Sequence, residues 1–156
     1  MTLTGTGSGR RLSNLTYLGF DYGARKIGIA VGQALTRTAR ELDTVRVKGS
    51  SPDWRRISEH VEAWRPAAFV VGLPLDTRGD ETNMSRLARR FGQTLANRYN
   101  LEVYWVNEFL STEAARQALY AQDRRSAVAI KDQVAARLIL ETFLNEQHLA
   151  QKDTSN

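Results

Sequence analysis

The chain of 156 residues contains no cysteine, which excludes disulfide bonds, thiolate zinc sites and cysteine nucleophiles. It has only two histidines, His60 and His148, so neither a histidine-rich metal site nor a Ser-His-Asp triad is favoured. No apolar run approaches the roughly 18 residues of a membrane-spanning helix, and none is predicted. Because the lack of cysteine suits a reducing compartment, we expect a cytoplasmic protein.

Both ends of the chain are polar. Residues 1–15 are rich in glycine, threonine and serine and have no apolar centre, which predicts a flexible arm and no secretory signal. The segment Gly5-Thr6-Gly7-Ser8-Gly9 lacks a preceding strand and a Gly-Lys-Ser/Thr ending, so it does not predict a phosphate-binding loop. Residues 16–147 are expected to form a single domain, and residues 148–156 a polar tail.

The charge balance is basic. Hydrophobic residues make up 42% of the chain and charged residues 25%, as in ordinary soluble domains. Lys and Arg number 22 against 17 Asp and Glu, which gives a net charge of +5. This excess is a mild argument for a polyanionic partner, although a solvated basic surface would explain it equally well.

The apolar pattern predicts an α/β fold: a mixed five-stranded sheet with an antiparallel start, parallel additions and helices on both faces. Strands are expected at residues 17–21, 27–33, 38–47, 67–71 and 101–106. The tight connection between the first two predicts an antiparallel hairpin. Ser51 is expected to cap a helix with Pro52 in its first position. Further helices are expected from about residue 81 to 98, from 111 to 121 and from 130 to 144.

Three acidic residues lie at the edges of segments that read as buried. Asp21 ends the first apolar strand, Glu108 follows the last one, and Asp132 opens an apolar helix pattern. Carboxylates are rarely buried unless they are paired or bind metal, so their convergence at one sheet edge would suit divalent cations and phosphoryl chemistry. Each also has an ordinary explanation: a turn-forming Asp, a solvated loop Glu and a first-turn helix Asp.

Four blocks resemble the YqgF family, described as pre-16S rRNA nucleases or Holliday junction resolvases. They are LGFDYGARKIGIAVG (residues 18–32), VVGLPL (70–75), NEFLST (107–112) and KDQVAA (131–136). The resemblance covers about residues 17–146 in the family's order. Asn107 and Phe109 depart from the Asp and Arg that the family often has there. The loss of that Arg removes a phosphate contact or an ion pair that would orient Glu108.

The resemblance implies an RNase H-like fold and metal-dependent cleavage of phosphodiester bonds. It implies that Asp21, Glu108 and Asp132 are catalytic and hold Mg²⁺ or Mn²⁺. The expected function is processing of the 5′ end of pre-16S rRNA in ribosome biogenesis, and the alternative is resolution of branched DNA in recombination and repair. The partner is therefore RNA (pre-rRNA) or branched DNA, with no membrane, and the protein is a monomer or a homodimer.

Basic residues near the acids are the candidates for contacts with the nucleic-acid backbone. They are Arg25, Lys26, Arg124 and Lys131, with Arg89 and Arg90 as further candidates. Two other function classes stay open. A non-catalytic nucleic-acid-binding protein could retain the same fold. A nucleotide phosphotransferase of the actin and sugar-kinase kind also begins with a strand, an Asp and a Gly turn, but the chain is short for the second domain that such enzymes need.

Overall fold

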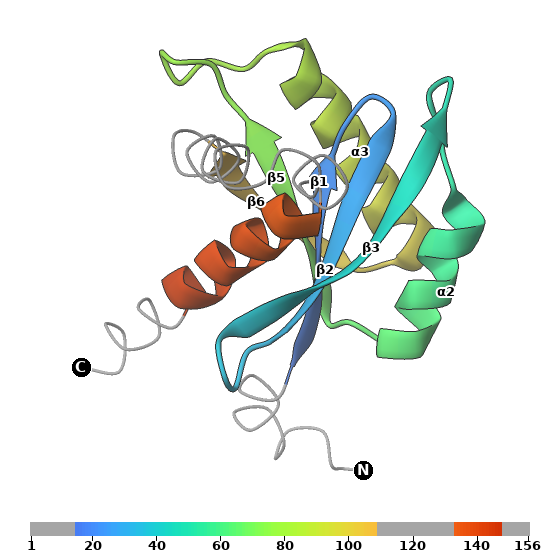
Figure 1. The fold of residues 1–156 in the computed structure, drawn as a ribbon, viewed down its shortest axis with the longest axis vertical. Coiled ribbons are helices and arrows are strands. Elements are labelled where there is room, and N and C mark those ends of the chain that lie inside the picture. The colour runs from blue at the N-terminus through green and yellow to red at the C-terminus, as the bar shows by residue number, and fades with distance from the viewer. Residues whose placement is uncertain (1–14, 109–132, 148–156) are drawn as a thin grey trace, which may run out of the picture.

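The computed structural model describes residues 15–108 and 133–147, and the predicted arm, the polar tail and the expected helix at 111–121 lie outside these ranges, apart from Leu15. The described strands form one sheet in the order β4-β3-β2-β1-β5-β6 (Figure 1). Its strands are β1 (Thr16–Tyr22), β2 (Lys26–Gln33), β3 (Thr38–Lys48), β4 (Ser51–Pro52), β5 (Ala68–Pro74) and β6 (Glu102–Glu108). The helices are α2 (Trp54–Trp64), α3 (Asn83–Tyr99) and a C-terminal helix described over residues 133–147.

The predicted mixed topology is confirmed. β1 and β2 form the expected antiparallel hairpin, and β3 extends it in the same sense. β5 then lies parallel to both β1 and β6, which makes it an interior strand of the described sheet. Its near-continuous apolar sequence follows from this position, because both faces of an interior parallel strand are covered. None of the described helices combines the length and the apolar character needed to cross a bilayer.

Within residues 15–108 and 133–147 the sheet has six strands, so the predicted number of five is wrong. Ser51 and Pro52 pair with Lys48 and Val47 as the short strand β4. The turn from β3 to β4 contains Gly49 at φ 63°, a conformation that glycine adopts without steric cost. Helix α2 begins after β4: the side chain of Asp53, and not that of Ser51, accepts the capping hydrogen bond from the Arg56 amide.

Helices cover both faces of the sheet, as predicted. On the first face α2 and α3 enclose a core that includes Phe20, Phe69 and Phe91. On the second face the C-terminal helix packs across the central strands (Figure 1), with Ala136, Ile139 and Leu140 against the sheet. Because strand side chains alternate between faces, the residues of β1, β2, β5 and β6 divide between these two cores.

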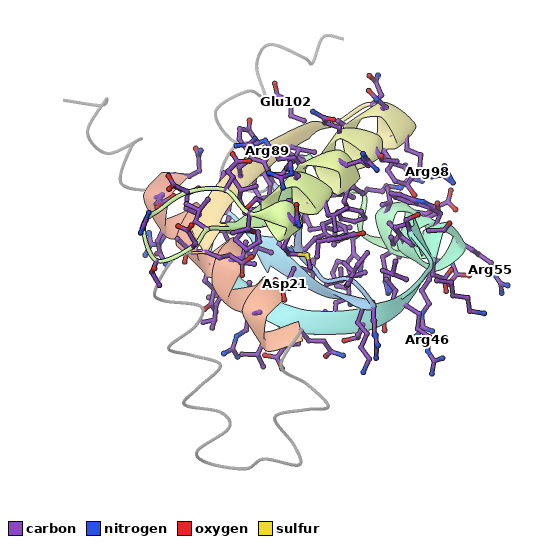
Figure 2. The ribbon with its side chains drawn as sticks, turned by 90° about the horizontal axis from the view of Figure 1, so that it is seen from above. Asp21, Arg46, Arg55, Arg89, Arg98 and Glu102 are labelled. Atoms are coloured by element: carbon purple, nitrogen blue, oxygen red, sulfur yellow. The ribbon has the colours of Figure 1, made fainter. Side chains whose placement is uncertain are left out.

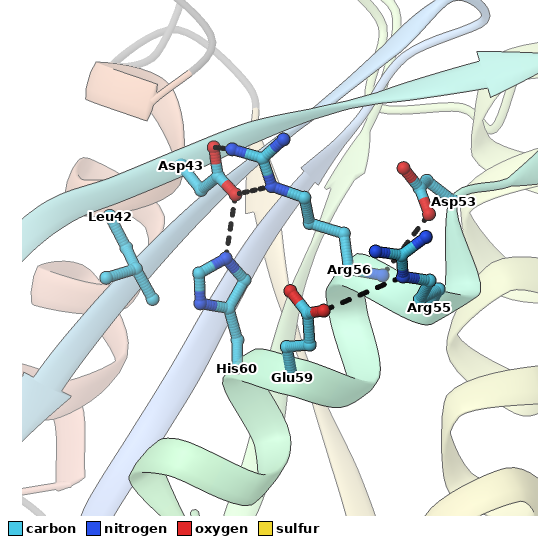
Figure 3. A pocket seen from close by; sticks show the side chains of 7 residues that line it. All are labelled: Leu42, Asp43, Asp53, Arg55, Arg56, Glu59 and His60. Carbon is cyan, nitrogen blue, oxygen red and sulfur yellow. Dashed lines mark hydrogen bonds and ion pairs between the residues drawn. The ribbon is translucent and has the colours of Figure 1, made fainter.

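Asp43 of β3 ties α2 to the first face (Figure 3). Its carboxylate accepts a hydrogen bond from Arg56 Nε at 2.8 Å and from the Thr44 amide at 2.8 Å, and it lies 2.7 Å from His60 Nε2. Burial raises the pKa of this carboxyl, but the hydrogen bonds from His60 and Thr44 and the charge of Arg56 outweigh burial and leave the pKa below its ordinary value.

The hollow that these residues line, of about 580 Å³, contains charged groups that already have partners. Arg55 pairs with Glu59 at 3.7 Å, and Asp53 caps the helix (Figure 3). We therefore interpret the cluster around Asp43 as a structural junction between α2 and the sheet.

We expect Asp43→Asn to lower the free energy of unfolding at neutral pH by about 1–3 kcal/mol, because the charge-assisted hydrogen bonds are lost. The folded state lowers the pKa of this carboxyl, so its contribution is complete above the ordinary value of 3.8 and is lost as the pH falls through the lowered folded-state value. Urea denaturation across a pH series should show that the difference in the free energy of unfolding between wild type and variant disappears below the folded-state pKa of Asp43. Glu62→Gln, at an exposed position of the same helix, should show no such gap.

Candidate functional site

Asp21 and Glu108 lie at the same edge of the sheet. Asp21 follows Phe20, the last β1 residue that pairs with β5, and it pairs with Gly28 of the hairpin. Glu108 is the last residue of β6 and pairs with Pro74 at the end of β5. Because β1, β5 and β6 are parallel, this edge collects their carboxyl ends, where ligands bind in open α/β sheets.

The two carboxylates also share one face. Tyr17, Val70 and Val106 all belong to the core beneath the C-terminal helix. Asp21 is four residues after Tyr17 and Glu108 is two after Val106, so strand alternation directs both toward that helix. Tyr22, next to Asp21, faces the opposite core instead, where its ring lies 5.2 Å from that of Phe91. Figure 2 shows Asp21 at this end of the sheet.

Gly72 of β5 lies between the two acidic strands and faces the same way. A Cβ atom at this position would come within 2.6 Å of Glu108 Oε2 and 2.4 Å of Ile139 Cδ1. The Glu108 carboxylate therefore extends over the β5 backbone, into space that any other residue would fill, in the direction of β1 and Asp21.

This arrangement fits a hard divalent cation. Asp21 is 5% exposed and Glu108 is 8% exposed, on the face that carries the apolar core beneath the C-terminal helix. Burying carboxylates is costly unless positive charge accompanies them, and carboxylate oxygens are the ligands that Mg²⁺ and Mn²⁺ prefer. Within residues 15–108 and 133–147, no three metal-ligating side chains gather at one point. The third predicted ligand, Asp132, lies outside the described residues, one position before the described helix.

The chain matches the RuvX family, described as Holliday junction resolvase, over residues 15–146. It belongs to this family. A protein of Nitrosococcus oceani named "Putative pre-16S rRNA nuclease" is 45% identical over 134 residues, which cover 83% of this chain and 86% of that protein. A Pseudomonas aeruginosa protein of the same name is 45% identical over 131 residues, covering 83% of this chain and 91% of its own length. RuvX is another name of the YqgF family, so the family predicted from the sequence is confirmed.

Two solved structures resemble the fold. Thermus thermophilus RuvC in complex with a Holliday junction substrate gives a TM-score of 0.53 at 18% identity, covering 86% of this chain and 96% of that one. The fowlpox virus Holliday junction resolvase gives 0.50 at 10% identity, covering 85% and 99%. These similarities confirm the RNase H-like fold predicted from the sequence.

The predicted basic residues divide into three groups. Arg25, in the β1–β2 turn, and Lys26, the first residue of β2, are both exposed just beyond Asp21 on the chain. Arg124 and Lys131 lie outside the described residues. Arg89 of the RuvX-family chain is already engaged: its Nε lies 2.9 Å from Glu81 Oε2 and its guanidinium lies over the Trp105 ring at 5.3 Å. Arg89 therefore contributes to the surface of α3, away from the carboxylate pair.

Two features of this RuvX-family site were missed from the sequence. In the sequence, Gly72 stands out only as part of the VVGLPL block, although its missing side chain makes room for Glu108. Thr44 pairs with Gly28, which pairs in turn with Asp21, so the three residues form one row across β1, β2 and β3. The Oγ1 of Thr44 is buried and has no hydrogen-bond partner among the described residues. The row could not be foreseen because the pairing of β3 is irregular.

We expect Gly72→Ala to displace the Glu108 carboxylate and to weaken Mn²⁺ binding at least about tenfold. Overpacking should also cost about 1–3 kcal/mol of stability. Mn²⁺ affinity can be measured by the loss of the free-ion electron paramagnetic resonance signal on titration.

The matched control is Gly92→Ala in α3, whose Cβ would come within 2.4 Å of Trp105 Cη2 on the other face. This variant should lose stability and keep the affinity for Mn²⁺. Unchanged affinity in Gly72→Ala would show that Glu108 is not a ligand.

Proposed function

We propose that this chain is a nuclease that hydrolyses phosphodiester bonds and processes the 5′ end of pre-16S rRNA in ribosome biogenesis. The observation that carries the proposal is the pair of buried carboxylates, Asp21 and Glu108, on one face of adjoining strand ends with Gly72 between them. The assignment to rRNA is supported by the relatives of Nitrosococcus oceani and Pseudomonas aeruginosa, which are 45% identical and carry the name of a pre-16S rRNA nuclease.

Asp21, Glu108 and Asp132 are proposed as the catalytic residues and as ligands of Mg²⁺ or Mn²⁺. When bound, such a cation lowers the pKa of a coordinated water and offsets negative charge on the leaving oxygen. Asp21 and Glu108 each sit on a hydrogen-bonded strand rather than on a free loop, so their positions are set before a ligand arrives. The apolar core under the C-terminal helix borders the pair and limits the access of bulk water from that side.

Arg25, Lys26, Arg124 and Lys131 are proposed to contact the phosphates of the bound nucleic acid. Such contacts fix the position of the backbone and supply salt-dependent affinity, but they carry no sequence information. The exposed positions of Arg25 and Lys26 beside the end of β1 support their part in this role.

Cleavage of Holliday junctions is the second candidate function. The family description and the similarity in fold to Thermus thermophilus RuvC favour it. A junction with two-fold symmetry requires two suitably spaced sites, so a resolvase would act as a homodimer, whereas end processing of RNA is open to a monomer. Light scattering of the purified protein, with and without a four-way junction, separates these cases.

We expect Asp21→Asn and Glu108→Gln to reduce cleavage on the order of 100-fold or more, because each removes a charged ligand of the cation. The assay incubates the purified protein with a 5′-extended 16S rRNA fragment and with a four-way DNA junction, in Mg²⁺, Mn²⁺ or chelator. Folding and RNA affinity should stay near wild type, since neither substitution changes the size of a side chain.

Asp80→Asn is the control, because Asp80 is an exposed acid in the loop before α3. It should cleave at the wild-type rate. Wild-type cleavage by Asp21→Asn would refute the proposed metal site, and binding without any metal-dependent cleavage by the native chain would favour a non-catalytic role.

A further inference from the structure

The face that carries the carboxylates continues across β2 and β3. Gly28 pairs with Asp21 on one side and with Thr44 on the other, so the three residues lie on one face in one row. The next row in the same direction pairs Lys26 with Arg46, and Lys48 follows two residues later on β3. Val45 and Val47, which alternate with these cations, are buried in the opposite core. Lys26, Arg46 and Lys48 therefore share the face of Asp21.

These three cations, named here the β3 cation strip, lie beyond the part of the sheet that the C-terminal helix covers. Leu140 and Leu144 of that helix contact the sheet at Gly32, toward the other end of β2. Arg137 of the helix reaches β3 at Glu41, at 2.8 Å. From Glu41 the strand runs past Thr44 to the strip, where all three side chains are exposed. Figure 2 shows Arg46 near the outside of the molecule.

The strip concentrates like charge. Lys26 and Arg46 are direct cross-strand neighbours, an arrangement that destabilises a sheet when both residues have the same charge. None of the three forms an ion pair with a described residue. By contrast, Arg55, Arg56, Arg89 and Arg137 each pair with a carboxylate. A cluster whose members repel one another gains most from a ligand that carries several negative charges.

An open hollow of about 550 Å³ runs beside the strip along the outer edge of β3. Arg46, Lys48 and Arg56 contribute positive charge to its lining, and Asp53 is its one acidic residue. Because the Asp53 carboxylate caps α2, it is already engaged with the Arg56 amide at 3.2 Å. The hollow therefore leaves Arg46 and Lys48 of the strip at an accessible surface beside β3.

We propose that the β3 cation strip binds the phosphodiester backbone of the nucleic acid on the β3 side of the carboxylate pair. This inference rests on the proposed function and extends it from Lys26 to Arg46 and Lys48, which lie outside the four family blocks. Strands lie about 4.8 Å apart, so β3 is roughly 10 Å from β1, about three nucleotide steps of 3.4 Å in a stacked strand. A nucleic-acid strand that runs from the carboxylates across β2 would reach the β3 cation strip within about three nucleotides.

The test is the salt dependence of binding by Arg46→Gln/Lys48→Gln. Fluorescence anisotropy is measured against KCl concentration in chelator, with a single-stranded RNA and with a four-way DNA junction. Loss of two phosphate contacts should reduce the slope of log K against log salt by about 1.4 for RNA and about 1.8 for duplex DNA. A smaller slope with only one of the two probes identifies which nucleic acid contacts the β3 cation strip.

The control is Arg55→Gln/Arg86→Gln, which removes the same charge from α2 and α3 on the other face. Its slopes should match wild type. Equal slopes in all proteins, or equal drops in both double variants, would overturn the proposal. Arg46→Lys/Lys48→Arg keeps both charges and should restore the wild-type slope. Because binding in chelator requires neither cation nor cleavage, its outcome is independent of the Asp21→Asn assay.

Discussion

The close packing of the C-terminal helix on the glycines of the sheet is the contact on which the candidate site depends. A Cβ atom on Gly19 would lie 2.9 Å from Leu140 Cβ, and one on Gly32 would lie 2.9 Å from Leu140 Cδ2. These glycines let the helix approach the strands more closely than larger side chains would allow. The missing side chain of Gly72 likewise leaves room for the Glu108 carboxylate beside Ile139. The described part of the helix, residues 133–147, therefore packs on the apolar rows of the sheet.

Two kinds of acidic residue are distinguished by the face they occupy. Asp43 is surrounded on the α2 side by Arg56, His60 and the Thr44 amide, a complete set of protein partners that stabilises its charge and fixes a helix to the sheet. Asp21 and Glu108 lie on the opposite face, at the carboxyl ends of parallel strands, which is where ligands bind in open α/β sheets. The surroundings of Asp43 stabilise the folded protein, whereas those of Asp21 and Glu108 suit a cation that arrives with substrate.

Much of the fold was predictable because local signals agreed with the tertiary structure. The hairpin around Gly23, the apolar strand β5 and the acids at strand ends each follow from short-range pattern. The strand β4 was missed because two residues give no periodicity and Ser51-Pro52 also reads as a helix start. Asp132, Arg124 and Lys131 lie outside the described residues, so their part in the site stays a prediction.

The irregularity in β3 explains why the cation strip could not be read from the sequence. Simple alternation would put Glu41, Asp43, Val45 and Val47 on one face. The register shifts between Ile29 and Ala30, however, so Glu41 pairs with Ala30 while Asp43 pairs with Ile29. One extra residue in β3 thus moves Glu41 to the face of the C-terminal helix, where it meets Arg137, and leaves Asp43 facing α2. The same shift assigns Arg46 and Lys48 to the face of Asp21, which makes the bulge the feature that aligns the cations with the carboxylates.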